Sequence, residues 1–300
     1  MTIRTQKSFE QQETGSLYLV PTPIGNLDDM TFRAVKILEQ VDCIASEDTR
    51  NTQKLLNHFD IKTPQISYHE HNTHERTPQL IGRMLKGESI AQVSDAGMPS
   101  ISDPGVDLVK AAVEAGLPVV PLPGPNAALT ALIASGLAPQ PFYFYGFLPR
   151  KKKELVESLE ELNRREETLI FYESPHRIKQ VVEQMLTVFG TDRQLVLARE
   201  VTKRFEEFIR GTTEEVLDWL EETQVRGEFV LIAEGNSKVQ EDEPALWEAI
   251  SPKAHVEALM EQQGMASKKA IKEVAKLRNL PKRDVYAAYH DIDQQEEDKR

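Results

Sequence analysis

A short apolar run and a proline-rich loop open the regular part of the chain: LYLVPTPIGNL, residues 17–27. LYLV has the composition of a buried strand, and a helical stretch over residues 31–40 follows the loop. Pro21 and Pro23 stiffen the loop, and Gly25 allows backbone to approach a ligand closely. Domains built from strands and helices place their ligand-binding loops at this position.

The alternation of strand and helix continues to about residue 135. Gly87 and Gly116 each end a helical stretch before the next apolar run. This rhythm predicts a mostly parallel sheet covered by helices. The later strands are DCIAS, QISY, SIAQVS and PVVPL, and the later helices cover residues 51–58, 77–86, 106–115 and 127–135.

A second region begins after residue 141, where the strands FYFYGF, TLIFYES, QLVLARE, RFEEFIR and GEFVLIAEG carry more aromatic residues. Only residues 201–204 separate the strands between residues 194 and 209, which is too short for a helical crossover. We therefore predict an antiparallel hairpin there, within a mixed α/β domain.

The C-terminal part is polar and acidic over residues 237–252 and then helical. Short helices over residues 268–277 and 281–290 resemble a helix-turn-helix, although a plain three-helix packing or dimerisation module fits the same pattern. The predicted domain boundaries are a disordered tail (1–14), an N-terminal α/β domain (15–137), a second α/β domain (138–236), a helical domain (245–292) and a tail (293–300).

The composition is that of a globular protein: of 300 residues, 40% are hydrophobic and 28% charged, with a net charge of −12. This charge opposes nonspecific coating of nucleic acid. Two basic segments nevertheless stand out, residues 150–153 and 253–283. The polar N-terminus, the short apolar runs and a single cysteine, Cys43, predict a cytoplasmic protein with a buried thiol.

Two further loops also follow predicted strands, SDAGMPSISDPG at residues 94–105 and PLPGPNAA at residues 121–128. Loops at the carboxyl ends of parallel strands converge on one crevice. Their small residues and carboxylates suit a polar small molecule, and Asp95 or Asp103 would favour a cationic centre such as a sulfonium. Neither a GxGxxG nor a Walker sequence is present.

These loops belong to an ordered set of seven motifs: LYLVPTPIGNL, ASEDTR, SDAGMPSISDPG, PLPGPNAA, FYESPHR, AREVTK and RGEFVLIAEG. The set resembles the tetrapyrrole-methylase superfamily of S-adenosylmethionine enzymes, and more narrowly its branch of small-subunit ribosomal RNA methyltransferases, over about residues 16–290. The resemblance implies a two-domain tetrapyrrole-methylase-like fold with the cofactor in the cleft between the α/β domains. It also implies a homodimer that methylates the 2'-hydroxyl of a cytidine in the decoding region of 16S rRNA.

The resemblance also implies a set of residues that line the S-adenosyl-L-methionine site. Tetrapyrrole-modifying relatives carry Gly-Asp-Pro where this chain has Gly97-Met98-Pro99, so their loop carboxylate is absent here. The implied cofactor-binding residues are Pro23, Ile24, Gly25, Asp95, Ala96, Gly97, Ile101, Ala127, Tyr172 and Glu173.

A hydroxyl nucleophile needs a general base within hydrogen-bond reach. Three motifs pair a carboxylate with a cation, which fits either catalysis or a structural ion pair: EDTR (47–50), ESPHR (173–177) and REVTK (199–203). The predicted catalytic residues are Glu47, Arg50, His176 and Glu200, with Asp48 and Glu173 as alternative bases. We predict no metal: His69, His71 and His74 lack a cysteine partner and a clear fourth ligand.

Basic residues near these motifs and in the helical domain are the predicted contacts to RNA phosphate. They are Lys151, Lys152, Arg177, Arg199, Lys203, Lys282 and Arg283. An acidic enzyme with small basic patches gains from a preformed RNA shape, so we predict that the assembled small ribosomal subunit is preferred to naked rRNA. Two alternatives remain, a tetrapyrrole methylase of the same fold and a noncatalytic RNA-binding assembly factor.

Overall fold

The computed structural model describes residues 5–8, 13–237, 250–278 and 280–290. The chain divides into two compact units, Met1–Asn236 and Ser237–Arg300. The predicted tail at residues 293–300 lies outside the described residues, as do parts of the predicted tail at residues 1–14 and most of the segment 237–252.

The first sheet is wholly parallel, with strand order β3-β2-β4-β1-β5, as the sequence predicted. Buried aliphatic side chains fill both of its faces, which is the pattern of a sheet covered by helices on each side. Cys43 is buried in this sheet. Its strands are β1 (Leu17–Leu19), β2 (Cys43–Ser46), β3 (Gln65–Ser67), β4 (Ile90–Val93) and β5 (Val119–Pro121).

Four helices and a short 3-10 helix connect these strands. Helices α1 and α2 supply apolar side chains to one core cluster, and α3 and α4 supply them to the other. The bounds are η1 (Leu27–Asp29), α1 (Phe32–Gln40), α2 (Thr49–His58), α3 (Thr73–Met84) and α4 (Val106–Glu114).

The second sheet is mixed, with strand order β6-β7-β10-β8-β9. β6 and β7 are parallel, whereas the pairs β7–β10, β10–β8 and β8–β9 are antiparallel. The β8–β9 pair confirms the predicted hairpin. The strands are β6 (Phe142–Phe147), β7 (Thr168–Glu173), β8 (Gln194–Arg199), β9 (Glu207–Thr212) and β10 (Phe229–Ala233).

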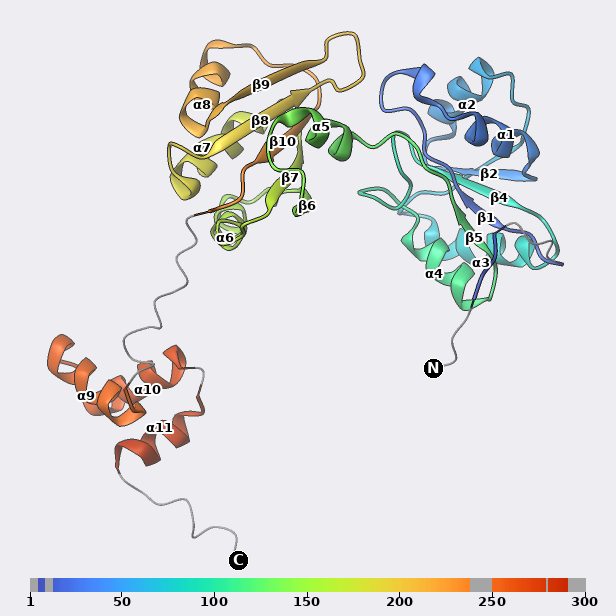
Figure 1. Ribbon diagram of the computed structural model, residues 1–300. Helices are drawn as coiled ribbons and strands as arrows, with labels where there is room; N and C mark the ends of the chain where they lie inside the picture. The colour runs from blue at the N-terminus through green and yellow to red at the C-terminus, as the bar shows by residue number, and fades with distance from the viewer. Residues whose placement is uncertain (1–4, 9–12, 238–249, 279, 291–300) are drawn as a thin grey trace, which may run out of the picture. The chain divides into compact units, whose positions relative to one another are not determined.

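Helix α5 (Ala127–Ser135) follows β5 of the first sheet but packs on β7, β8 and β10 of the second (Figure 1). The domain boundary predicted from the sequence, at residue 137, instead assigns this helix to the N-terminal α/β domain. Ala128, Ala131 and Leu132 bury one side of α5 against that sheet. The opposite face of the sheet packs against α6 (Lys152–Leu162), α7 (Ile178–Phe189) and α8 (Thr213–Glu222).

The N-terminal segment is held to the edge of the first sheet by Gln6, within the tail predicted to be disordered. Its side-chain Nε2 donates to the Val119 carbonyl (2.9 Å), and its Oε1 accepts from the Val119 N–H (2.8 Å). The amide thus satisfies backbone groups of β5, an edge strand that would otherwise leave them unpaired.

The second unit contains α9 (Pro252–Gln263), α10 (Ser267–Leu277) and α11 (Lys282–Tyr289). Val256, Ile271, Val274 and Val285 are buried in its own small core. Arg278 ties this unit together, since its guanidinium donates to the Ile250 carbonyl (2.7 Å) and to His255 Nδ1 (3.2 Å). Over the described residues, none of the helices is both long and apolar enough to cross a membrane.

Candidate functional site

A cavity of about 460 Å³ lies in the first unit, among loops that follow strands of both sheets. We call it the large cavity. The loops after β1, β4 and β5 reach it from the first sheet, and the ends of β6, β7, β8 and β10 reach it from the second. Its lining consists of Ile24, Ala96, Gly97, Met98, Ile101, Ser102, Asp103, Asn126, Ala127, Phe147, Tyr172, Glu173, Ser174, Pro175, Ala198, Glu200, Val201, Lys203, Glu228, Phe229 and Val230.

The structure separates the ten predicted cofactor residues into two groups. Seven line the large cavity: Ile24, Ala96, Gly97, Ile101, Ala127, Tyr172 and Glu173. The other three, Pro23, Gly25 and Asp95, line a second pocket of about 210 Å³, which we call the small pocket. Thr22, Leu27, Asn51, Thr52, Lys54, Leu55 and Ser94 complete its wall.

A backbone bridge between the loops after β1 and β4 carries residues of both pockets. The Thr22 N–H donates to the Gly97 carbonyl (2.9 Å), and the Gly97 N–H donates to the Thr22 carbonyl (3.0 Å). The buried Thr22 hydroxyl adds a bond to the Ser94 carbonyl (3.0 Å). Gly97 has φ +80°, a conformation that residues with a Cβ rarely adopt. Residues on either side of this bridge therefore line different pockets.

Glu173 places a buried carboxylate at the wall of the large cavity. Its side chain is 1% exposed. Oε1 accepts from the Ser174 N–H (2.8 Å), whereas Oε2 has no hydrogen-bond partner among the described residues and lies 3.6 Å from Arg177 Nη1. A buried acceptor without a donor is costly, so this oxygen marks where a donor group of a ligand belongs.

Aromatic and aliphatic side chains give the cavity an apolar wall. The Tyr172 ring contacts Phe144 and Phe147 edge-on, with centroids 5.1 and 5.7 Å apart. Ile24 packs into the same cluster from the first sheet. Burial raises the pKa of the Tyr172 hydroxyl, so this group stays protonated and can donate a hydrogen bond at neutral pH.

The loop after β8 brings strained backbone to the cavity. Glu200 and Thr202 both have positive φ, +50° and +67°. Lys203 Nζ bridges Glu200 Oε1 (2.9 Å) and Glu228 Oε2 (2.8 Å). Its side chain lies over Gly25, where a Cβ would come within 2.3 Å of Lys203 Cγ. The lysine therefore connects the two halves of the first unit.

The hydrogen bonds of Lys203 determine the charge states of Glu200 and of the lysine itself. Burial opposes the charged form of Glu200, but hydrogen bonds from Lys203 and the Glu228 N–H lower the pKa of Glu200 below its ordinary value. Burial likewise opposes the charge on Lys203, but Glu228 and Glu200 raise the pKa of the lysine above its ordinary value. A carboxylate held ionised in this way is a weak base.

Two predicted RNA contacts of the second sheet are engaged within the protein. The Arg177 guanidinium donates to the carbonyls of Leu148 (3.2 Å) and Pro149 (2.8 Å). Arg199 donates to the Arg226 carbonyl (2.7 Å) and also pairs with a carboxylate of β9. The structure thus ties these two cations, like Lys203, to neighbouring groups.

The remaining predicted residues do not line the large cavity, although Glu47 lies near Asp103 at its wall. Arg50 pairs with Asp48, is 86% exposed and lines an outer groove of about 630 Å³ beside α2 and β3. Glu47 Oε2 accepts from the Asp95 N–H (3.3 Å). The other residues are exposed on the surface: His176, Lys151, Lys152, Lys282 and Arg283. Over the described residues, no group of three or more His, Cys, Asp or Glu side chains is arranged to hold a metal ion.

Asp103 lines the large cavity. Its position in the sequence predicts only that it is a partner for a cationic centre. Burial is the main reason that the pKa of Asp103 is raised from 3.8 to about 6. The negative charges of Glu47 and Asp95 also raise this pKa, whereas a hydrogen bond with Ser94 lowers it. Burial also raises the pKa of Glu47. Asp103 is therefore mostly ionised at neutral pH and still basic enough to accept a proton.

The raised pKa of Asp103 predicts a pH-dependent stability. The folded state binds an extra proton between about pH 4 and 6, so this carboxylate costs folding free energy as the pH rises through that window. We expect Asp103→Asn to raise the free energy of unfolding by about 1 kcal/mol at pH 7.5, because partial exposure screens the effect. Near pH 4 the gain should vanish. Urea unfolding at both pH values measures this, and an equal gain at both would contradict it.

The chain is similar to known proteins over most of its length. The model of the family described as "Tetrapyrrole (Corrin/Porphyrin) Methylases" matches residues 16–217. A relative named ribosomal RNA small subunit methyltransferase I from Bacillus subtilis is 54% identical over 290 residues, which cover 96% of this chain and 99% of the relative. A relative of the same name from Synechocystis is 46% identical, covering 91% of this chain and 96% of the relative.

Solved structures show the same fold at lower identity. A cobalt precorrin-4 methyltransferase has a TM-score of 0.55 at 20% identity and covers 73% of this chain and 94% of its own. A Thermus thermophilus uroporphyrin-III C-methyltransferase, complexed with S-adenosylhomocysteine, has a TM-score of 0.53 at 17% identity and covers 75% of this chain and 100% of its own. The chain therefore belongs to the tetrapyrrole methylase family.

Proposed function

We propose that this protein uses S-adenosylmethionine to methylate small-subunit ribosomal RNA, at the 2'-hydroxyl of a cytidine in the decoding region of 16S rRNA. The observation that carries the proposal is the extent of the match to the B. subtilis relative. The family model ends at residue 217, whereas this match covers 96% of the chain, so it must include part of the C-terminal unit, which contains the basic segment 253–283.

The large cavity fits S-adenosylmethionine by its chemistry. The cofactor combines an aromatic base and aliphatic carbons with donor groups and a sulfonium charge. The apolar wall at Ile24 and Tyr172 suits the base and the aliphatic carbons of the cofactor. Glu173 Oε2, which accepts no hydrogen bond from the described residues, and the Asp103 carboxylate suit its donor groups and its positive charge. When bound, the cofactor supplies a methyl group that an oxygen nucleophile can accept.

The contribution of the chain to the reaction is positioning and proton transfer. In-line approach of a hydroxyl to a methyl group is sensitive to orientation, and rigid loops reduce the entropy lost in reaching it. We assign the base to the carboxylates of raised pKa, Asp103 at the cavity wall and Glu47 next to it. Glu200, although it lines the cavity, is held ionised by Lys203 and instead orders the loop.

Methyl transfer tests the proposal directly. The chain is incubated with tritiated S-adenosylmethionine and either naked 16S rRNA, assembled small subunits or a tetrapyrrole. We expect label in RNA, faster with the assembled subunit, and nuclease digestion that locates it on a cytidine ribose. Label in the tetrapyrrole alone would identify the first alternative. Cofactor binding without transfer to any substrate would favour the noncatalytic assembly factor.

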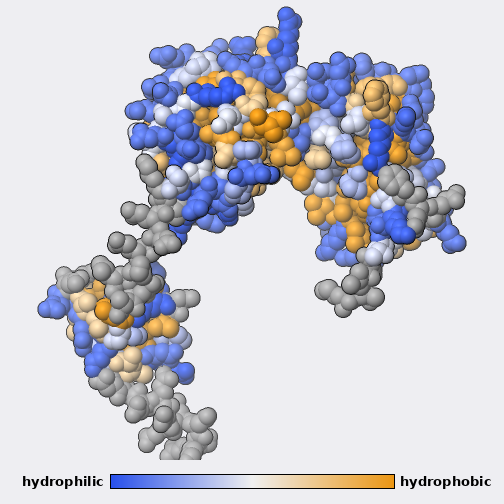
Figure 2. Space-filling view, in the orientation of Figure 1, coloured by the Kyte–Doolittle hydropathy of each residue, from blue (hydrophilic) through white to orange (hydrophobic). Residues whose placement is uncertain are grey.

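A homodimer is part of the proposal, and α5 offers a surface for it. This helix is apolar on nearly all sides, and on its outward side Leu129 is 45% and Ile133 80% exposed. Figure 2 shows hydrophobic surface gathered over this helix. Light scattering of a dimer would give twice the chain mass of 34.0 kDa.

Gly97→Val tests the cofactor site. A β-branched residue is strained at φ +80°, and its side chain would press on Ile24 at the cavity wall. We expect calorimetry to show at least a roughly tenfold loss of S-adenosylmethionine affinity. Gly116→Val is the matched control, because Gly116 has φ +74° and open space around it. Equal affinity in the two folded variants would remove Gly97 from the site.

Lys282→Ala with Arg283→Ala tests the RNA role of the second unit. Both residues are exposed at the start of α11. If they neutralise phosphates, the log–log slope of RNA affinity against salt should decrease by roughly one per lost contact. Lys110→Ala, an exposed lysine of α4, should leave the slope unchanged. A lower melting temperature with an unaltered slope would show a packing module instead.

A further inference from the structure

The small pocket has a chemistry different from that of the large cavity. Its volume of about 210 Å³ is below the roughly 300–1,000 Å³ of pockets that bury a whole drug-sized ligand, so it has room for one base or one sugar. Pro23, Leu27 and Leu55 give it apolar wall, and Asn51, Lys54 and Asp95 give it polar groups.

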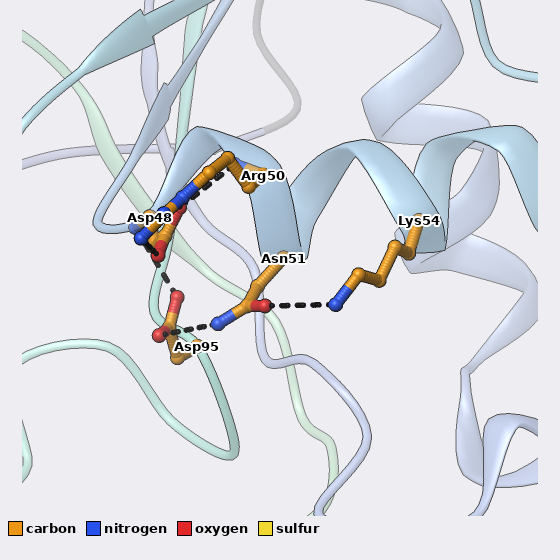
Figure 3. Close-up of polar contacts among 5 residues, drawn as sticks. All are labelled: Asp48, Arg50, Asn51, Lys54 and Asp95. Atoms are coloured by element: carbon orange, nitrogen blue, oxygen red, sulfur yellow. Dashed lines mark hydrogen bonds and ion pairs between the residues drawn. The ribbon is translucent and has the colours of Figure 1, made fainter.

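The three polar side chains form one chain of hydrogen bonds at the start of α2 (Figure 3). Lys54 Nζ donates to Asn51 Oδ1 (3.3 Å), and Asn51 Nδ2 donates to Asp95 Oδ2 (3.0 Å). The Asp48 N–H donates to Asp95 Oδ1 (3.2 Å). A cation on one side and a carboxylate on the other thus fix which end of the Asn51 amide is the donor.

This arrangement leaves a defined set of groups for a ligand. Asn51 Nδ2 keeps one N–H, and each carboxylate oxygen of Asp95 keeps a lone pair. An acceptor and a donor therefore stand side by side. Their complement is a donor next to an acceptor, which the pairing edge of a nucleobase presents: an amino group beside a ring nitrogen in cytosine and adenine, and a ring N–H beside a carbonyl in uracil.

Lys54 differs from the other cations near α2. Arg50 pairs with Asp48 and Lys62 pairs with Asp60. Within the described part of the chain, Lys54 is paired with no carboxylate, and its contact is the neutral amide of Asn51. Its charge is available to a phosphate group.

We propose that the small pocket binds one unpaired nucleotide of the substrate RNA. The pairing edge of the base meets Asp95 and Asn51, and the phosphate meets Lys54. This inference rests on the proposed function and deepens it. It also reassigns Asp95, Pro23 and Gly25 from the cofactor to the RNA. The Thr22–Gly97 bridge, which carries residues of both pockets, sets the two ligands on neighbouring sides of one loop pair.

Binding of nucleoside monophosphates by the full chain tests the inference. With S-adenosylhomocysteine present, CMP, AMP, UMP and cytidine are titrated and followed by ligand-observed NMR. We expect CMP, AMP and UMP all to bind with similar affinities, because each pairing edge places a donor beside an acceptor. Cytidine should bind about tenfold more weakly than CMP, since it lacks the phosphate for Lys54.

Two variants and one control assign the groups. Lys54→Ala should weaken CMP to about the affinity of cytidine, and Asp95→Asn should weaken CMP and cytidine alike, because a neutral amide replaces the charged acceptor of the base. Lys36→Ala, an exposed lysine of α1 outside the pocket lining, should change neither. A melting curve of each variant shows that it is folded.

Three results would overturn the inference: no binding of any monophosphate, equal binding of CMP and cytidine to the wild-type chain, or unchanged CMP binding in both variants. Loss of S-adenosylhomocysteine affinity in Asp95→Asn, with CMP binding retained, would return Asp95 to the cofactor. Failure of the proposed function is a separate result, since it appears as a wild-type chain that transfers no methyl group to RNA.

Discussion

Two hydrogen bonds between Thr22 and Gly97 organise the whole candidate site. They join the loops that follow the neighbouring strands β1 and β4, so the two loops stay hydrogen-bonded to each other beyond the carboxyl ends of the strands. Consecutive residues next to the bridge line different pockets: Ile24 and Ala96 line the large cavity, while Pro23 and Asp95 line the small one. The positive φ of Gly97 is what this close pairing requires.

The second constraint is the connection between the two halves of the first unit. Helix α5 follows a strand of one sheet and buries its apolar face on the other, and Ile24 enters the same core cluster. Lys203 spans the halves again, over Gly25 and between two carboxylates. Positive-φ residues and an unpartnered buried oxygen gather around the cavity, which is where proteins retain strain for function.

Much of the fold could be predicted from local sequence. Alternating strand and helix patterns indicated the parallel sheet, and the four-residue connection at 201–204 indicated the β8–β9 hairpin. The partner of α5 could not be predicted in this way. A helix that is apolar on nearly all sides does not reveal which sheet it will cover.

The site was predicted less completely, for a physical reason. Motifs indicate which residues lie near a sheet edge. They do not indicate which neighbouring groups form hydrogen bonds or ion pairs with each side chain. Arg177 and Arg199 are bound by backbone carbonyls and Lys203 by two carboxylates, contacts that arise only in the folded chain. Asp103 gains its raised pKa from burial, which sequence spacing does not show. The division of the cofactor residues between two pockets arises from the folded shape of the two loops, which their motifs do not indicate.

The most direct test of this account is a crystal structure of the chain with S-adenosylhomocysteine. The account predicts the ligand in the large cavity, against Ile24, Gly97 and Tyr172, with a donor group on Glu173 Oε2, the oxygen that accepts no hydrogen bond from the described residues. Ligand density in the small pocket beside Asp95, or in the outer groove beside Arg50, would contradict it.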